Sequence, residues 1–191
     1  MDRIPAFVAG CSLFVYWGAV VVKAQRARRW QHGANVIPPE RTGRWLRIVW
    51  VPLVIAWCAQ PWLRFAHDGM LRSRPIAIVG ALLCIAATAA TFVCWRAMGQ
   101  SWRIGIDPGE TTTLVVSGPF RLVRHPIYAL SILLMLGTVM VTQTRLMLGL
   151  AVLHFALLQW EAAREEAHLS AKHGEEYERY RRATGRFLPR V

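Results

Sequence analysis

Residues Gly118–Leu130 read GPFRLVRHPIYAL, and they stand directly before an apolar stretch that ends at Trp160. A second charged block, Arg164–Arg182, follows that stretch and contains the run GEEYERYRR. We expect the apolar residues between the blocks to form two antiparallel helices joined by a tight turn at Thr142–Arg145. Both charged blocks then emerge on the same side of a membrane, which predicts a polar site at the membrane surface.

The composition is typical of an integral membrane protein. The chain has 191 residues, of which 54% are hydrophobic, whereas soluble domains usually contain about 45–50% apolar residues. Five apolar runs approach the roughly 20 residues that cross a hydrocarbon core as a helix. We therefore predict one all-α integral membrane domain over residues 1–191. Its five predicted transmembrane helices cover residues 5–23, 45–63, 75–97, 126–141 and 146–160.

The tail, residues 161–191, is polar, and we expect it to be helical and cytoplasmic. Helix-forming residues continue from the fifth apolar run to about His173, where Gly174 interrupts them. A shorter helix is expected at residues 175–182. The apolar residues Phe187–Pro189 are expected to dock back on the protein or on the membrane.

The net charge of +12 resembles that of proteins that bind nucleic acid. Here the basic residues cluster at the ends of apolar runs, as the positive-inside rule requires, so we expect no nucleic-acid partner. Eighteen of the 23 basic residues fall on one side of the five predicted helices, which places the N-terminus outside and the C-terminus in the cytoplasm. The excess of arginine, with abundant alanine, indicates a GC-rich genome and hence a bacterial inner membrane.

Arg124, His125 and Tyr128 surround the predicted start of the fourth helix. Pro126 suits a first helical position because its missing N–H would be unpaired there. The free N–H groups of that turn, its positive dipole end and the guanidinium of Arg124 suit an anionic group. Alternatively, the arginine and the tyrosine only anchor the helix at the level of the lipid headgroups.

Glu165 and Glu166 leave the fifth helix just beyond the membrane, where adjacent glutamates usually form a solvated face. The predicted hairpin returns them to the surface that carries Arg124, His125 and Tyr128. Such a site suits a ligand with charges of both signs, and S-adenosylmethionine carries an α-amino group, a carboxylate, a sulfonium and ribose hydroxyls. The sequence has no glycine-rich phosphate fingerprint, so a nucleotide-like cofactor would be bound without a Rossmann fold.

Histidines and cysteines carry less information. His168 and His173 are five residues apart, which misaligns them on a helix, so we expect no metal site. The four cysteines show neither metal-ligand nor secreted spacing. His154 is a polar residue inside an apolar helix, where it either faces an interior cavity or bonds to a backbone carbonyl.

Both charged blocks resemble those of the isoprenylcysteine carboxyl methyltransferase family and its phospholipid methyltransferase relatives. Leu114–Tyr128 (LVVSGPFRLVRHPIY) resembles the RHPxY element of the family, and Glu165–Pro189 resembles its EE…GEEYxxY…P element. Met98–Arg103 (MGQSWR) is similar to the segment that follows the third helix of bacterial members. The resemblance covers roughly the C-terminal half, and family members often carry glycine where this chain has Leu130.

The resemblance implies a membrane-embedded methyltransferase that uses S-adenosylmethionine. Its acceptor would be the carboxylate, thiol or amine of an isoprenoid- or lipid-like molecule that enters from the membrane. The residues on family positions around the cofactor are Arg124, His125, Tyr128, Glu165, Glu166 and Tyr177. Arg182 and Arg186 lie near the arginine that the family uses for a substrate carboxylate. The residues assigned to catalysis are Arg124, Glu165 and Arg182.

Two other classes of function remain open. NADPH-dependent double-bond reductases of the sterol reductase type share a similar C-terminal block, although they are longer and have more helices. The second open class is a non-catalytic membrane protein that keeps the cofactor-binding residues. Bound S-adenosylhomocysteine would exclude the reductase, and turnover of a lipid acceptor would exclude the non-catalytic protein.

Overall fold

A computed structural model describes residues 3–30, 41–63, 73–102 and 114–190 of the chain. Every regular element in these ranges is helical, in agreement with the predicted all-α class. The α-helices are α1 (Arg3–Trp30), α2 (Arg41–Ala59), α3 (Arg74–Met98), α4 (Pro126–Thr142), α5 (Arg145–His173) and α6 (Glu175–Ala183). Two short 3-10 helices, η1 (Gly99–Ser101) and η2 (Gly118–Arg121), precede α4.

The helices lie where the sequence predicts them, but some boundaries differ. α1 continues past the predicted end at Lys23 to Trp30, and α2 begins and ends earlier than the predicted span 45–63. α5 continues unbroken into the charged tail and ends at His173, and α6 follows Gly174, as predicted.

The helices differ in whether they are long and apolar enough to cross a membrane. Within the described residues, α1, α3 and α5 are long and apolar enough to cross a membrane, whereas α2 and α4 provide shorter apolar stretches. These helices support an integral membrane protein, and the count of five spans stays a prediction.

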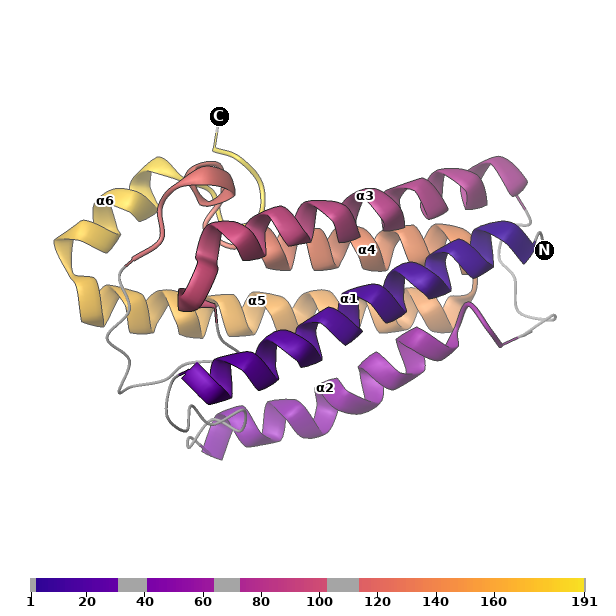
Figure 1. Cartoon of the computed structure of the whole chain (residues 1–191), viewed down its shortest axis with the longest axis horizontal. Coiled ribbons are helices and arrows are strands. Elements are labelled where there is room, and N and C mark those ends of the chain that lie inside the picture. The colour runs from indigo at the N-terminus through magenta and orange to yellow at the C-terminus, as the bar shows by residue number, and fades with distance from the viewer. Residues whose placement is uncertain (1–2, 31–40, 64–72, 103–113, 191) are drawn as a thin grey trace.

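The helices form an elongated bundle (Figure 1). α3, α4 and α5 run along its long axis, α1 crosses them obliquely, and α2 packs against α1 and α5. The N-terminus lies at one end of the bundle, and α6 gathers with the C-terminal segment at the other.

α3 and α4 touch through two glycines. A Cβ atom at Gly80 would lie 2.6 Å from the carbonyl oxygen of Gly137, and a Cβ atom at Gly137 would lie 2.7 Å from the carbonyl oxygen of Gly80. Small residues of this kind allow membrane helices to approach closely. The contact holds α4 firmly against α3. The first turn of α4 carries the predicted site residue Tyr128.

The α4–α5 hairpin closes in a tight turn, as predicted. Gln143 ends α4 with a left-handed backbone (φ 52°), and Thr144 caps α5 by accepting a hydrogen bond from the backbone N–H of Met147. The side-chain amide of Gln143 also accepts from the backbone N–H of Ser73 and donates to its carbonyl oxygen. The turn is therefore tied to the start of α3.

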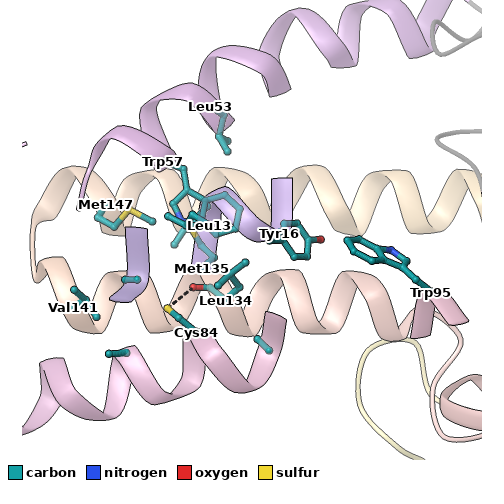
Figure 2. Packing of buried hydrophobic residues seen from close by; sticks show 14 of the residues in the cluster. Leu13, Tyr16, Leu53, Trp57, Cys84, Trp95, Leu134, Met135, Val141 and Met147 are labelled. Atoms are coloured by element: carbon teal, nitrogen blue, oxygen red, sulfur yellow. Dashed lines mark hydrogen bonds between the residues drawn. The ribbon is translucent and has the colours of Figure 1, made fainter. Parts of the chain in front are cut away.

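Both the interior and the outer surface of the bundle are apolar. Side chains from α1 to α5 fill the interior around Leu13, Trp57, Leu134, Met135 and Met147 (Figure 2). Large exposed apolar side chains occur on the outside of all five long helices, for example Phe7, Ile55, Leu82, Leu136 and Val152. An outer surface of this kind indicates contact with lipid.

Candidate functional site

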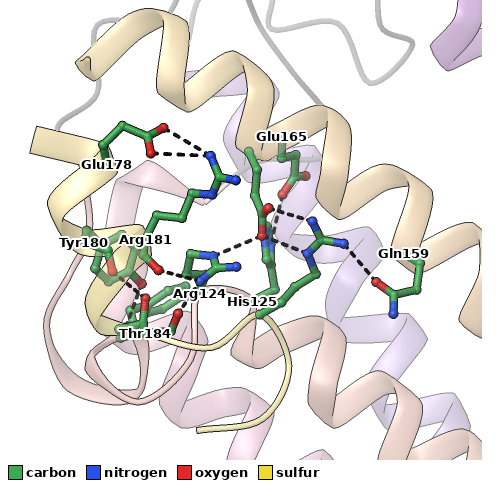
Figure 3. A network of polar contacts seen from close by, with 11 residues as sticks. Arg124, His125, Gln159, Glu165, Glu178, Tyr180, Arg181 and Thr184 are labelled. Carbon is green, nitrogen blue, oxygen red and sulfur yellow. Dashed lines mark hydrogen bonds and ion pairs between the residues drawn. The ribbon is translucent and has the colours of Figure 1, made fainter. Parts of the chain in front are cut away.

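The two charged blocks meet at the open end of the α4–α5 hairpin (Figure 3). We call this region the mouth; it consists of residues 124–128, residues 159–166 of α5, α6 and residues 184–187. The backbone N–H of Arg124 donates to the carbonyl oxygen of Gly185 (2.8 Å), and that of His125 donates to Arg186 (3.0 Å). These bonds fix the C-terminal segment beside the start of α4.

Glu166 is the centre of the charge network at the mouth. Its carboxylate accepts hydrogen bonds from Arg124 Nε (3.0 Å), Arg186 Nε (3.0 Å) and Arg186 Nη2 (2.7 Å). Arg186 also donates to Gln159 Oε1 (3.1 Å). Because the Glu166 side chain is only 7% exposed, these charge-assisted bonds are well shielded from water. They join α5, the start of α4 and the C-terminal segment.

Arg124 uses two of its nitrogen atoms within the protein. Nε binds Glu166, and Nη1 donates to the carbonyl oxygens of Arg181 (3.0 Å) and Thr184. Nη2 takes no part in these bonds. It is therefore the donor that this arginine can offer to a ligand.

Glu165 neighbours Glu166 in the sequence but has different partners. The Tyr128 hydroxyl donates to Glu165 Oε1, and His125 Nδ1 lies 3.5 Å from Glu165 Oε2. The rings of His125 and Tyr128 stack, with centroids 5.3 Å apart. The Glu165 side chain is 25% exposed, against 7% for Glu166, so Glu165 is the more accessible carboxylate.

His125 lies between the two carboxylates. Its Nε2 is 3.3 Å from Glu166 Oε1, on the opposite side of the ring from Glu165. Burial of the imidazole lowers its pKa, but the two carboxylates, Glu165 at 3.5 Å and Glu166 at 3.3 Å, outweigh burial and raise the pKa above the usual 6.5. The charged imidazolium is therefore more populated here than in a free histidine.

Tyr177 is the buried aromatic residue of α6. It is 1% exposed, and its ring lies 6.1 Å from that of Tyr180. Within the part of the chain that the structure describes, its hydroxyl has no hydrogen-bond partner. Tyr180 differs, because its hydroxyl donates to the carbonyl oxygen of Phe120 (2.6 Å).

Phe187 confirms the predicted docking of the tail onto the protein. Its ring centroid lies 6.1 Å from that of His125 and 6.4 Å from that of Phe155. The next residue, Leu188, is exposed. The C-terminal segment thus covers one side of the mouth.

The structure brings together six of the seven predicted site residues. Arg182 differs: its side chain is exposed on α6, and its carbonyl oxygen accepts from Arg190 Nη1 (2.8 Å). Arg186 takes part in the network with Glu166 instead. Sequence reasoning did not single out Gln159, although it stands seven residues before Glu166 and hence on the same face of α5.

Metal ligands do not cluster in the described ranges. No three His, Cys, Asp or Glu side chains there lie close enough together to hold a metal ion. The four cysteines are free thiols. Arg103, which ends the motif MGQSWR, lies outside the described residues.

Comparison with known proteins gives one family and two curated relatives. Residues 76–176, more than half of the chain, match the model of a family described as phospholipid methyltransferase.

The relatives are named for metal resistance. The nickel-cobalt-cadmium resistance protein NccN of Alcaligenes xylosoxydans xylosoxydans is 30% identical over 115 residues, which are 60% of this chain and 53% of that protein. The cobalt-zinc-cadmium resistance protein CzcN of Cupriavidus metallidurans is 32% identical over 160 residues, which are 82% of this chain and 67% of that protein. The matched part thus spans about half the length of the first relative and about two thirds of the second.

Proposed function

The chain belongs to the phospholipid methyltransferase family, and on this premise we propose that it is an S-adenosylmethionine-dependent integral membrane methyltransferase. Its acceptor is a lipophilic molecule that presents an amine, a thiol or a carboxylate at the cytoplasmic membrane face. The methyl group passes from the sulfonium to this nucleophile, and S-adenosylhomocysteine leaves.

The observation that carries this proposal is the set of polar groups that the mouth leaves available. They are Arg124 Nη2, the partly exposed carboxylate of Glu165 and the buried Tyr177 hydroxyl. A guanidinium suits the cofactor carboxylate, and a carboxylate suits its α-ammonium or ribose hydroxyls. The tyrosine hydroxyl adds a neutral donor and acceptor. These groups match the carboxylate, the α-ammonium group and the ribose hydroxyls of S-adenosylmethionine.

The residues of the mouth then divide into two roles. Glu165, Tyr128 and His125 hold the ligands, whereas Glu166 and Arg186 hold the C-terminal segment in place. Of the two tail arginines, Arg186 is better situated than Arg182 to meet an acceptor carboxylate, because it is bonded into the mouth. We keep Arg124 as the residue that orients an anionic group.

Methyl transfer from a sulfonium is an in-line displacement that depends on alignment and on exclusion of water. Phe187 and the buried Tyr177 limit the access of water at the mouth. A thiolate or carboxylate needs no general base. A neutral amine forms an ammonium product whose proton must leave, and Glu165 is the partly exposed carboxylate beside it.

We propose that the whole chain, residues 1–191, is one domain with five spans in a bacterial inner membrane, with the N-terminus outside. Cysteines placed at Glu176, exposed on α6, and at Arg145, exposed at the hairpin turn, test this orientation. Glu176→Cys should react with an impermeant thiol reagent only from the cytoplasmic side, and Arg145→Cys only from outside. The reverse pattern would overturn the proposed orientation.

Calorimetry in detergent tests the cofactor assignment. S-adenosylhomocysteine should bind in the micromolar range, about −8 kcal/mol, and Glu165→Gln should weaken binding. Glu176→Gln, an exposed glutamate of α6, is the matched control and should bind normally. No heat and no thermal shift at millimolar ligand would contradict the proposal, and binding of NADPH in its place would favour the reductase alternative.

The names of the two relatives motivate a second proposal, about physiology. We propose that methylation by this chain supports tolerance to cobalt, nickel, zinc or cadmium. Deletion of the gene should lower the metal concentration that stops growth, and the wild-type gene should restore it. Restoration by Glu165→Gln at equal expression would separate metal tolerance from methyl transfer.

A further inference from the structure

Leu188 is an apolar side chain in a polar part of the molecule. It is 78% exposed, the highest value of any large apolar side chain in the described ranges. Most other exposed apolar side chains lie on the long helices, where lipid covers them, whereas Leu188 lies beyond the last helix. A large apolar side chain held in water loses the favourable free energy of burial, so the surroundings of Leu188 need an explanation.

The contacts of the neighbouring Phe187 place Leu188 at the edge of the membrane. The ring of Phe187 lies 6.4 Å from that of Phe155, which is 45% exposed on the apolar part of α5. Phe155 precedes Trp160 by five residues, about 7.5 Å along the helix. Trp160 is partly exposed at the end of the predicted span 146–160, where the interfacial aromatic belt of membrane proteins lies. Phe187 and Leu188 are therefore level with lipid close to the headgroups.

Close backbone contacts hold the C-terminal segment at this level. The backbone N–H of His125 donates to the carbonyl oxygen of Arg186 (3.0 Å). A Cβ atom at Gly185 would collide with the carbonyl oxygen of Leu188, so the chain folds back tightly between these two residues. Pro189 has no N–H to leave unpaired, which suits backbone that borders lipid. The exposure of Leu188 is thus set by the fold.

The same stretch of chain is strongly basic. Residues 179–190 read RYRRATGRFLPR and contain five arginines and no acidic residue. Two of the arginines, Arg181 and Arg186, pair with glutamates. The other three are exposed: Arg179, Arg182 and Arg190. Arg190 Nη1 donates to the carbonyl oxygen of Arg182 (2.8 Å), which brings the last two together. Exposed arginines beside an apolar side chain complement the phosphates and acyl chains of an anionic membrane surface.

We propose that residues 186–190 anchor the mouth to the surface of an anionic lipid bilayer. Leu188 inserts among the acyl chains next to the headgroups, and Arg182 and Arg190 contact lipid phosphates. The lipid is a surface here and not a methyl acceptor, so the inference goes beyond the proposed function and does not depend on it. Because Arg186 Nη2 in the same segment is bonded to Glu166 (2.7 Å), the anchor ties the mouth to the bilayer.

Quenching by lipid tests the insertion of Leu188. The whole chain carries the fluorescent residue dansylalanine in place of Leu188 and is placed in nanodiscs of equal parts phosphatidylcholine and phosphatidylglycerol. A share of one lipid carries a nitroxide quencher on its acyl chain. We expect quenching at position 188 to be comparable to that of the same probe at Val152, a lipid-facing position of α5. It should be several-fold stronger than at Glu176, an exposed position of α6.

The headgroup of the quencher-bearing lipid tests the arginines. At position 188, quenching by labelled phosphatidylglycerol should exceed quenching by labelled phosphatidylcholine, because each arginine near the surface favours an anionic lipid by about fivefold. Arg182→Gln combined with Arg190→Gln should remove this preference and keep the quenching itself. Added salt should weaken the preference, and the probe at Val152 should show none.

Two results would overturn the proposal. Quenching at position 188 no stronger than at Glu176 would exclude insertion; a second copy of the chain that covered Leu188 would shield the probe and give this result. Equal quenching by the two labelled lipids with all arginines present would refute the contact with anionic lipid. If the probe at position 188 lowers the melting temperature in detergent, the exposed Pro189 next to it carries the probe, with the same expected results.

Discussion

The two ends of the α4–α5 hairpin both carry polar residues but use them differently. At the turn, Thr144 caps α5, and the amide of Gln143 bonds to both backbone groups of Ser73. At the mouth, Glu165 keeps part of its carboxylate exposed, and the Tyr177 hydroxyl has no partner within the described residues. Polar side chains at the turn complete the fold, whereas those at the mouth leave hydrogen-bonding capacity for a ligand.

The largest effect is expected at Glu166, which serves the fold although it lies at the mouth. Glu166→Ala leaves Arg124 and Arg186 without their anion. Breaking a buried ion pair costs about 3–5 kcal/mol, and the partial exposure of Arg186 (35%) favours the lower end of that range. Chemical denaturation in detergent should show this loss, together with loss of S-adenosylhomocysteine binding. A change in unfolding free energy below about 1 kcal/mol would mean that the ion pairs of Glu166 with Arg124 and Arg186 contribute little to stability.

Arg145→Ala is the matched control at the other end of the hairpin. Arg145 is an exposed arginine at the start of α5. Its removal should cost no more than about 1 kcal/mol of unfolding free energy, the upper end of what an exposed charged contact contributes, and should leave ligand binding unchanged. A loss comparable to that of Glu166→Ala would erase the contrast between the two ends.

The next prediction pairs one residue from each end. Glu165→Gln should weaken S-adenosylhomocysteine binding by about ten- to a hundredfold, the value of a hydrogen bond to a charged group, with little loss of stability. Gln143→Ala should do the opposite and cost about 1–2 kcal/mol of unfolding free energy without changing affinity. Calorimetry gives the S-adenosylhomocysteine affinity of each variant, and denaturation gives its unfolding free energy. If both variants changed both quantities equally, the division of roles would be wrong.

Tyr177→Phe gives a smaller effect of the same kind. The substitution removes only a hydroxyl that has no partner in the described part of the chain, so the unfolding free energy should stay constant or rise slightly. Binding of S-adenosylhomocysteine should weaken about tenfold at most if the hydroxyl contacts the ligand. A stability loss with unchanged affinity would place this tyrosine with the structural residues instead.

The smallest effect concerns pH. Because the two carboxylates raise the pKa of His125, the stability that its charged form contributes is present below its unfolded pKa of about 6.5. That stability is lost as the pH rises through the higher pKa of the folded state. Melting temperatures should therefore fall slightly on the alkaline side of neutrality, and His125→Gln should flatten this dependence. An unchanged profile in the variant would assign the pH dependence to another group.

Much of the helical framework could be predicted because it depends on local signals. Pro126 suits the first position of α4, and Gly174 separates α5 from α6. The extension of α1 to Trp30 was not predicted, because hydropathy detects only the apolar part of a helix. Residues 24–30 (AQRARRW) carry three arginines among helix-forming residues, and they continue α1 beyond the apolar span.

The division of roles within the site could not be predicted from the sequence. Glu165 and Glu166 are adjacent, yet they point in directions about 100° apart on a helix and meet different partners. Arg182 and Arg186 both match the motif region, but α6 exposes the first, and the chain after α6 returns the second to Glu166. Only the tertiary arrangement separates such neighbours.

Transfer of a labelled methyl group to a lipid tests the central claim most directly. Purified protein is incubated with membrane lipids and S-adenosylmethionine that carries a trideuterated methyl group, and the lipid extract is examined by mass spectrometry. We predict a lipid that gains one trideuteriomethyl group with the wild type and none above background with folded Glu165→Gln. Absence of any labelled lipid from wild-type protein that binds S-adenosylhomocysteine would contradict the account and favour a non-catalytic protein.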